Sequence, residues 1–110
     1  MGKAENDLIH AALEWLGLKG VFPWRNNTGA VKYDKKGGGY YYVKFGVPGM
    51  SDILGILPDG RFLAAEAKAN PDDDLSADQY LFIERVKVQG GVGFMFRTLE
   101  ELIENVEAEL

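Results

Sequence analysis

Asp52 and Glu66 are predicted to face each other across a β-hairpin, with Lys68 beside them. Residues 51–57 and 61–68 have the composition of two strands, and the Pro-Asp-Gly sequence between them favours a tight turn. If the hairpin is centred on the middle residue of that turn, the two acids pair directly, with Cβ atoms roughly 4.5–5.5 Å apart. The lysine lies two residues beyond the glutamate, so it points to the same face of the hairpin.

These residue types suit a divalent-metal site. Mg²⁺ prefers oxygen ligands and usually takes one or two carboxylates, with waters and substrate phosphate in the remaining positions. Asp52 and Glu66 could supply the two carboxylates, and the backbone carbonyl of Ala67 could add a third protein oxygen. Such a cation would polarise a scissile phosphate and lower the pKa of a bound water, which Lys68 could orient. The cluster therefore indicates phosphodiester hydrolysis that depends on Mg²⁺ or Mn²⁺.

An ordinary surface ion pair at the edge of a sheet is the alternative explanation for the same three residues. Exposed pairs of this kind are common and contribute only about 0–1 kcal/mol to stability. The strands that flank Asp52 and Glu66 are apolar on both faces, which predicts that they are buried. Two unpaired carboxylates would be costly in such a place without a cation, and this favours the metal site.

The composition describes one small domain that spans residues 1–110. With 46% apolar and 26% charged residues, the chain can bury a core and is not disordered by composition. The absence of cysteine excludes a disulfide framework, a thiolate nucleophile and a cysteine-ligated zinc site. No apolar run approaches the roughly 20 residues of a membrane span, and no secretory signal stands at the N-terminus. We therefore expect a soluble, cytoplasmic protein with no membrane partner.

The net charge of −5 is unevenly distributed along the chain. Residues 1–50 hold seven Lys/Arg and four Asp/Glu, a net charge of +3. Residues 51–110 hold five Lys/Arg and thirteen Asp/Glu, a net charge of −8. A local basic surface could therefore bind nucleic acid although the whole chain is acidic. An incidental asymmetry is the alternative. The basic residues of this predicted surface are Lys19, Arg25, Lys32, Lys35, Lys36 and Lys44.

Hydrophobic periodicity and turn chemistry predict an α/β fold. The predicted elements are a helix over 4–18, a strand over 40–45, the hairpin over 51–68, a helix over 76–89, a strand over 92–96 and a helix over 98–109. Capping-box patterns open the second and third helices. Because both faces of the hairpin are apolar, its strands should be central in a mixed sheet that helices cover on both faces.

The order of these features resembles the PD-(D/E)XK nuclease superfamily and, more narrowly, a stand-alone VRR-NUC domain of the kind found in phages. The matching segments are Glu5, Arg25-Asn26-Asn27-Thr28-Gly29, Gly49-Met50-Ser51-Asp52, Glu66-Ala67-Lys68 and Gln79. The resemblance implies a restriction-endonuclease-like fold, with an αβββαβ core followed by a C-terminal helix. Ser51 stands where the superfamily's name motif has a proline, a residue that ligates nothing.

The resemblance also implies roles for individual residues. The hairpin acids and the Ala67 carbonyl would bind metal, and Lys68 would position the nucleophilic water. Glu5 would be an outer or second-metal carboxylate, although an acid in the first turn of a helix also favours the helix dipole. Gln79 would assist beside the lysine, although its place in a capping box would also explain it.

Basic and amide side chains in the first half of the chain are candidates for binding nucleic acid. An Asn-rich turn is also common in ordinary loops, and lysines beside three glycines suit either an arm over DNA or a solvated hairpin tip. The candidate residues are Arg25, Asn26, Asn27, Lys35, Lys36 and Lys44.

The expected activity is metal-dependent endonucleolytic hydrolysis of DNA. The resemblance points to branched DNA, notably four-way (Holliday) junctions, cut by a homodimer. Two active sites suit a symmetric junction, and two copies would pool two small footprints. The alternative is a non-catalytic nucleic-acid-binding or assembly subunit with a nuclease-like fold.

Overall fold

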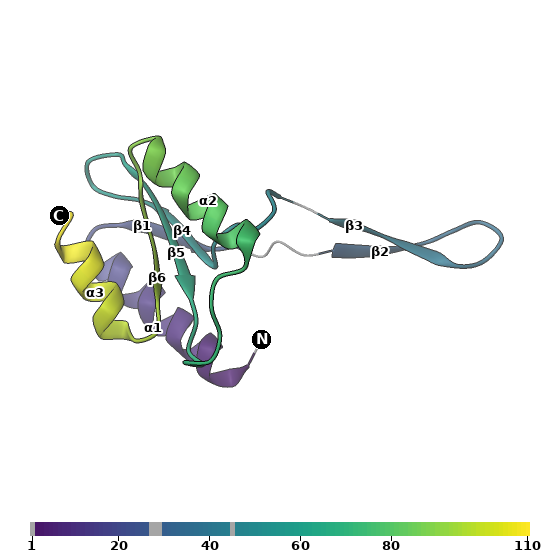
Figure 1. The fold of residues 1–110 in the computed structure, drawn as a ribbon, viewed down its shortest axis with the longest axis horizontal. Helices are drawn as coiled ribbons and strands as arrows, with labels where there is room; N and C mark the ends of the chain where they lie inside the picture. The colour runs from purple at the N-terminus through teal and green to yellow at the C-terminus, as the bar shows by residue number, and fades with distance from the viewer. Residues whose placement is uncertain (1, 27–29, 45) are drawn as a thin grey trace.

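The computed structural model describes residues 2–26, 30–44 and 46–110, and Figure 1 shows how its elements are arranged. Along the chain these are α1 (Lys3–Leu18), β1 (Phe22–Arg25), β2 (Ala30–Asp34), β3 (Tyr40–Lys44), β4 (Ile53–Ile56), β5 (Phe62–Ala67), α2 (Ala77–Val88), β6 (Val92–Phe96) and α3 (Leu99–Glu107). Within the described residues, no helix combines the length and apolar composition that crossing a membrane requires.

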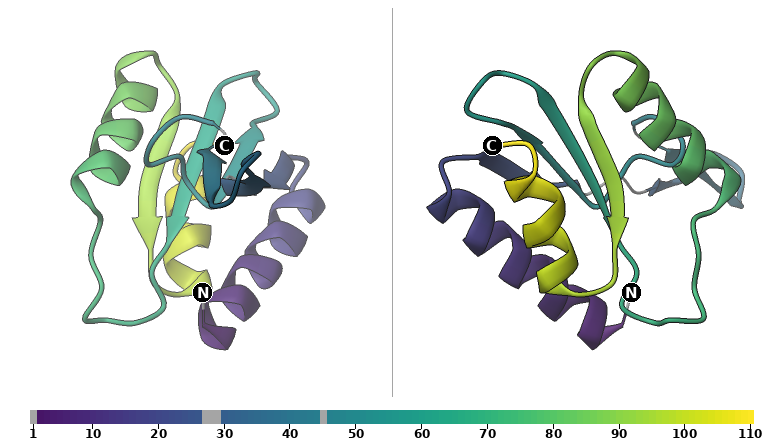
Figure 2. Two further views of the ribbon diagram at one scale, coloured as in Figure 1. Left: turned by 90° about the vertical axis from the view of Figure 1, so that its right-hand side faces the viewer. Right: turned by 60° about the vertical axis from the view of Figure 1, so that its left-hand side comes forward.

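A four-stranded mixed sheet forms the centre of the molecule, in the order β1-β4-β5-β6. The first three strands pair antiparallel, and β6 runs parallel to β5. Helices α1 and α3 cover one face of the sheet and α2 covers the other, as the two views of Figure 2 show. This arrangement confirms the predicted α/β fold with a mixed sheet between helices.

The β4–β5 hairpin has the register that the turn chemistry predicts. Ile53 pairs with Ala65 and Ile56 pairs with Phe62, so the hairpin is centred on Asp59, the middle residue of the turn, as predicted. Gly60 adopts a φ of 94°, a left-handed conformation that only glycine adopts readily, and this closes the turn. If the same register continues by one residue beyond the start of β4, Asp52 lies opposite Glu66.

Side-chain caps fix where α2 and α3 begin. At α2 the predicted capping box is complete, since Ser76 Oγ accepts from Gln79 N–H at 3.2 Å and Gln79 Oε1 accepts from Ser76 N–H at 2.9 Å. At α3 only half of the predicted box forms. Thr98 Oγ1 accepts from Glu101 N–H, but the Glu101 carboxylate accepts from Arg97 N–H instead of from the cap residue.

Two strands in the first half of the chain differ from expectation. The strand predicted over 40–45 is β3, but it pairs with β2 and lies outside the central sheet. These two strands and their turn, residues 30–44, form an arm that projects from the body and extends the molecule to 55 Å in a 55 × 30 × 25 Å envelope. The sheet strand in its place is β1, which none of the predicted elements covers. It contains Pro23, a residue that sheets tolerate on edge strands.

Candidate active site

Asp52 and Glu66 lie together at the open end of the β4–β5 hairpin, as predicted. The backbone N–H of Asp52 donates to Glu66 Oε2 at 3.0 Å, and the N–H of Ala67 donates to Asp52 Oδ2 at 2.9 Å. Each carboxylate is therefore bonded to the backbone of the opposite strand, so the hairpin register itself sets where both acids point. We call Asp52, Glu66, Lys68 and Gln79 the carboxylate corner.

Burial makes the ionised form of Glu66 unfavourable. Its side chain is 3% exposed. Burial first, and the nearby Asp52 charge second, raise the pKa of Glu66 to about 8, against the opposing effects of the Asp52 N–H and the Lys68 charge. The oxygens of the two neighbouring carboxylates could ligate a divalent cation, and its charge would relieve the repulsion between the acids. Because Glu66 is buried and none of the ion pairs among the described residues includes Lys68, the surface-pair alternative does not fit.

The backbone of Lys68, just after β5, is hydrogen-bonded through both its N–H and its carbonyl. Its N–H donates to the Phe96 carbonyl at 2.9 Å, and its own carbonyl accepts from Arg97 Nη1 at 3.3 Å. The same Arg97 nitrogen donates to the Asn70 carbonyl at 2.9 Å. Arg97 thus fixes the backbone from which the lysine side chain extends. Sequence reasoning missed this arginine, because only the parallel pairing of Ala67 with Phe96 brings it beside Lys68.

Gln79 forms the predicted capping box and also contacts the buried acid, whereas its assistance to Lys68 stays a prediction. While its Oε1 accepts from the Ser76 N–H of the capping box, its Nε2 donates to Glu66 Oε1 at 3.0 Å. The start of α2 therefore orients the buried glutamate directly. A close approach of the backbone at Gly49 brings the segment before the aspartate against this helix. A Cβ there would lie 2.2 Å from the Asp78 carbonyl, and the φ of 74° also favours glycine.

Ser51, which precedes Asp52 in place of the motif proline, is fully buried. Its hydroxyl has no hydrogen-bond partner within the described part of the chain. Nothing in the structure explains this hydroxyl.

The candidate nucleic-acid residues divide between two places. The N–H of Asn26 donates to the Asp52 carbonyl at 2.8 Å, so this residue adjoins the carboxylate corner, and Arg25 Nη2 donates to Asn6 Oδ1 at 2.6 Å. Asn27 lies outside the described residues. Three lysines belong to the arm: Lys35 and Lys36 follow β2 in its turn, and Lys44 ends β3.

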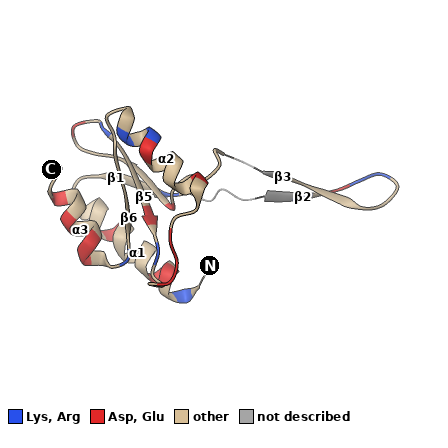
Figure 3. Cartoon of the chain, in the orientation of Figure 1, with Lys and Arg blue, Asp and Glu red and all other residues tan. Residues whose placement is uncertain are grey.

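The other basic residues of the predicted surface also lie on separate elements. Lys32 is on the arm, and Lys19 is the C-cap of α1, where its ammonium lies 5.7 Å from the centre of the Trp15 ring. Figure 3 shows acidic residues along α3 and the loop before α2, with basic residues at the arm's tip. The structure does not gather the six predicted residues on one element.

Glu5 lies in the first turn of α1 and is half-buried. Its neighbour Asn6 receives the Arg25 hydrogen bond described above. Among residues 2–26, 30–44 and 46–110, no three acidic or histidine side chains gather closely enough to hold a metal ion. The structure therefore does not bring Glu5 to the Asp52–Glu66 pair, and its role in binding an outer or second metal stays a prediction.

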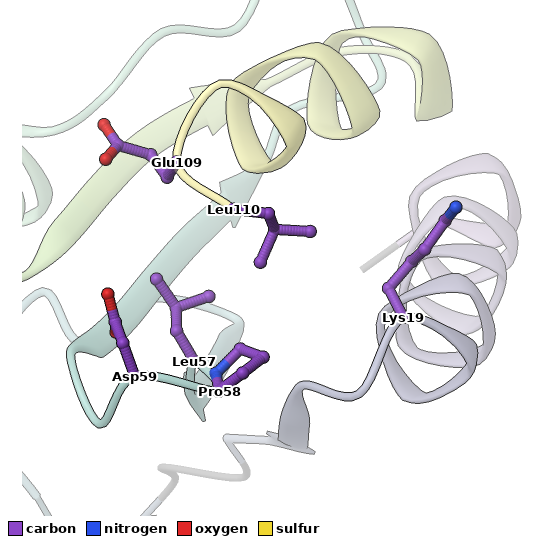
Figure 4. Close-up of a pocket in the computed structure, with 6 residues that line it drawn as sticks. All are labelled: Lys19, Leu57, Pro58, Asp59, Glu109 and Leu110. Carbon is purple, nitrogen blue, oxygen red and sulfur yellow. The ribbon is translucent and has the colours of Figure 1, made fainter.

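A separate hollow opens at the other end of the β4–β5 hairpin, beside the turn (Figure 4). It has a volume of about 280 Å³ and its lining is mostly apolar. The residues that line it are Lys19, Leu57, Pro58, Asp59, Glu109 and Leu110. Because the hairpin turn and the carboxylate corner are at opposite ends of the same two strands, this hollow takes no part in the chemistry of the acids.

No family model matches the sequence, and no match to it was found among the curated proteins. A solved structure described as a VRR_NUC domain is similar to this chain, with a TM-score of 0.66 and 19% identical residues. The match covers 96% of this chain and 97% of that one. At this identity the likeness is one of fold, and it extends over nearly the whole of both chains.

Proposed function

Because the chain has the fold of a VRR-NUC domain, the nuclease fold of the PD-(D/E)XK type, we propose that it is a metal-dependent endonuclease that hydrolyses DNA phosphodiester bonds. The observation that carries this proposal is the carboxylate corner. A buried glutamate and an aspartate are bonded to each other's strands, and the pKa of Glu66 is raised to about 8. Perturbed acids of this kind are concentrated at functional sites.

Asp52, Glu66 and the carbonyl of Ala67 would hold Mg²⁺ or Mn²⁺. In a β-strand, the N–H and C=O of one residue point to the same side, and the Ala67 N–H points to Asp52. Its carbonyl oxygen is therefore expected on the side of the acids. A cation bound there would polarise the scissile phosphate and supply a water of lowered pKa.

The remaining residues of the corner position the reacting groups. Hydrogen bonds from Asp52 N–H and Gln79 Nε2 occupy one site on each Glu66 oxygen, so the glutamate keeps a fixed orientation. Lys68 extends from a backbone that Phe96 and Arg97 hold, and its ammonium is suited to orient the attacking water and offset charge on the phosphate. Preorganised groups of this kind lower the barrier without reorganising during the reaction.

We further propose that the substrate is branched DNA, such as a four-way junction, and that a homodimer cuts it. Asn26 beside Asp52 would contact the DNA next to the scissile phosphate, with Arg25 and Asn27. Lys35, Lys36 and Lys44 of the arm would contact more distant phosphates. Two sites related by symmetry suit a substrate whose strands are themselves related by symmetry.

A cleavage panel tests the function. Wild-type protein is incubated with Mg²⁺ or Mn²⁺ and with single-stranded, duplex, flap and four-way-junction DNA, beside Lys68→Ala and Asp52→Asn. We expect metal-dependent cleavage by the wild type, strongest on branched DNA, and loss of cleavage in both variants. Equal cleavage by all three proteins would contradict the assignment. DNA binding without cleavage under any metal would favour the non-catalytic subunit instead.

A further inference from the structure

The arm presents two chemically different faces to solvent. Tyr33 and Tyr41 pair across the strands, and their rings stack with centres 5.5 Å apart. Val43 is two residues further along β3, so it shares this apolar face. The opposite face carries Lys32, whose ammonium lies 4.5 Å from the centre of the Tyr40 ring. All five of these side chains are classed as exposed although three form an apolar surface.

An arm of this kind needs a partner surface. A hairpin of two strands is at best marginally stable in water, and it normally needs a third strand or a packed layer. Among the residues that the structure describes, β2 and β3 pair only with each other, and the arm points away from the body (Figure 1). The described part of the body thus does not provide that layer for the apolar face.

The central sheet also has an uncovered apolar surface, beside α2. Helix α2 packs on β5 and β6, whereas β1 and β4 extend past it. Phe22 and Ile56 pair across these strands and are 67% and 40% exposed, and Trp24 is 38% exposed. The Phe22 and Trp24 rings lie 5.7 Å apart. We call Phe22, Trp24 and Ile56 the apolar strip.

The strand register places this strip on the α2 side of the sheet. Trp24 pairs with Leu54, which pairs with Ala64, and Ala64 pairs with Gly93. A Cβ on Gly93 would lie 3.1 Å from the Ile83 side chain of α2. Because residues paired in this way share one face of a sheet, the strip and α2 lie on the same face.

We propose that the arm of one copy lies with its Tyr33, Tyr41 and Val43 face on the apolar strip of a second copy, and that the second arm does the same in return. The product is a homodimer in which two arms are exchanged about a twofold axis. This deepens the homodimer proposed above and rests on that part of the proposed function. The face that carries Lys32 stays outward, where it is available to DNA.

The area meets the lower limit for a biological interface. A buried aromatic side chain covers about 150–250 Å², and roughly 40–70% of the surface of each aromatic residue in the two patches is still exposed. Together with Val43 and Ile56, the six residues of one arm and one strip would bury about 500 Å². Two such contacts would bury about 1,000 Å² of mostly apolar surface, before any polar rim is counted, which is the minimum expected of a biological interface.

Net charge favours the association of two copies. Residues 30–44 contain four lysines and one aspartate, a net of +3, whereas the rest of the chain has a net of −8. The arm is thus attracted at long range to the acidic body of another copy, and association should weaken with salt.

Engineered cysteines test the contact directly, because the chain has no cysteine of its own. A chain with Tyr41→Cys is mixed with a chain with Phe22→Cys, without metal or DNA, and oxidised gently. We expect a disulfide between the two different chains at a yield at least about tenfold above that of the matched pair Tyr42→Cys and Phe22→Cys, because Tyr42 is on the other face of the arm. Equal yields from the two pairs would overturn the proposal.

Sedimentation velocity provides the second measurement. Wild-type protein should form a dimer at micromolar concentration, and Tyr33→Ser with Tyr41→Ser should raise the dissociation constant at least about 100-fold. Tyr40→Ser with Tyr42→Ser is the matched control and should leave it within about threefold. A wild type that stays monomeric at about 100 µM, or a control that weakens association equally, would overturn the proposal. A dimer that fails to cut DNA would contradict the proposed activity instead, so the two failures are distinguishable.

Discussion

Glu66 in the carboxylate corner and Tyr42 on the arm both belong to β-strands, but their surroundings differ. Glu66 is 3% exposed, and both of its carboxylate oxygens accept hydrogen bonds, from Asp52 on one strand and Gln79 on a helix. Tyr42 is 57% exposed, and in the described part of the chain its strand pairs only with β2. Contacts from a neighbouring strand and from a helix hold the Glu66 side chain in place, whereas the position of Tyr42 depends on the pairing of β2 with β3.

This difference separates two tasks. Bond cleavage needs groups held to within a fraction of an ångström, and such groups are best placed where a sheet and a helix meet. Contact with a large partner needs reach and exposed area, which the arm provides. Substitutions in the carboxylate corner should therefore change the reaction, and substitutions on the arm should change association and DNA affinity.

The largest effect is expected from the acids themselves. Glu66→Gln or Asp52→Asn should lower single-turnover cleavage by roughly 10²–10³-fold or more, because each removes a charged metal ligand. The double variant should lose little more, since the two acids act as a unit. Asp73→Asn, in the exposed loop before α2, is the matched control and should cut as wild type. Comparable loss in that control would show that general acidity, and not the corner, matters.

Arg97 should have the next largest effect. Arg97→Ala removes the hydrogen bonds to the Lys68 and Asn70 carbonyls, so the lysine loses one support of its backbone. We expect cleavage at saturating DNA to fall by about 10-fold, with DNA affinity little changed and partial rescue in Arg97→Lys. Arg85→Ala, at an exposed position on α2, is the control. A fall in affinity without a fall in the cleavage rate would assign Arg97 to DNA binding.

Gln79 can be separated into its two roles. Ser76→Ala removes the cap alone and should cost about 1 kcal/mol of unfolding free energy, with cleavage nearly unchanged. Gln79→Ala should cost a similar amount and also lower cleavage several-fold, because Glu66 loses its amide partner. Denaturant unfolding and cleavage assays on both variants measure this. Equal cleavage by the two variants would leave Gln79 with a structural role only.

The arm lysines should give the smallest change in the reaction. Lys35→Ala with Lys36→Ala should reduce the slope of log affinity against log salt by about 1.8, the value for two lost phosphate contacts on duplex DNA. The cleavage rate at saturating DNA should stay within about twofold. Lys3→Ala with Lys87→Ala, a pair of exposed lysines on α1 and α2, is the control and should leave the slope unchanged.

The sequence predicted the pairing of Asp52 with Glu66 because that geometry is local. A Pro-Asp-Gly turn and two apolar strands determine the pairing of Asp52 with Glu66, and a capping box places Gln79 at the start of a helix. The arrangement of helices around a mixed sheet follows from the same patterns. These features depend on neighbours in the chain or on one short turn.

Other features depend on contacts between distant segments, and the sequence did not reveal them. Asn26 adjoins Asp52 only because β1 pairs with β4, and the proline in β1 hides that strand. Arg97 reaches Lys68 only through the parallel register of β5 and β6. The composition of β3 predicted a strand, but not that the strand would leave the sheet as half of an arm.

The titration of Glu66 links the metal to pH. Its pKa is near 4.5 in an unfolded chain and about 8 in the folded protein, so the folded state keeps a proton that the unfolded chain loses. In metal-free protein this contribution to stability is complete below about pH 4.5 and is lost as pH rises through about 8. A divalent cation takes the place of the proton, so binding should strengthen over the same range.

The most direct test of the central claim is thermal unfolding during a Mn²⁺ titration at pH 8, with wild type, Glu66→Gln and the Asp73→Asn control. At a Mn²⁺ concentration about 100 times the dissociation constant, the wild type and the control should gain about 10 °C or more in Tm. Glu66→Gln should gain almost nothing, and the wild-type gain should shrink at pH 5.5. An equal gain in Glu66→Gln and wild type would contradict the assignment of the Asp52–Glu66 pair as the metal site.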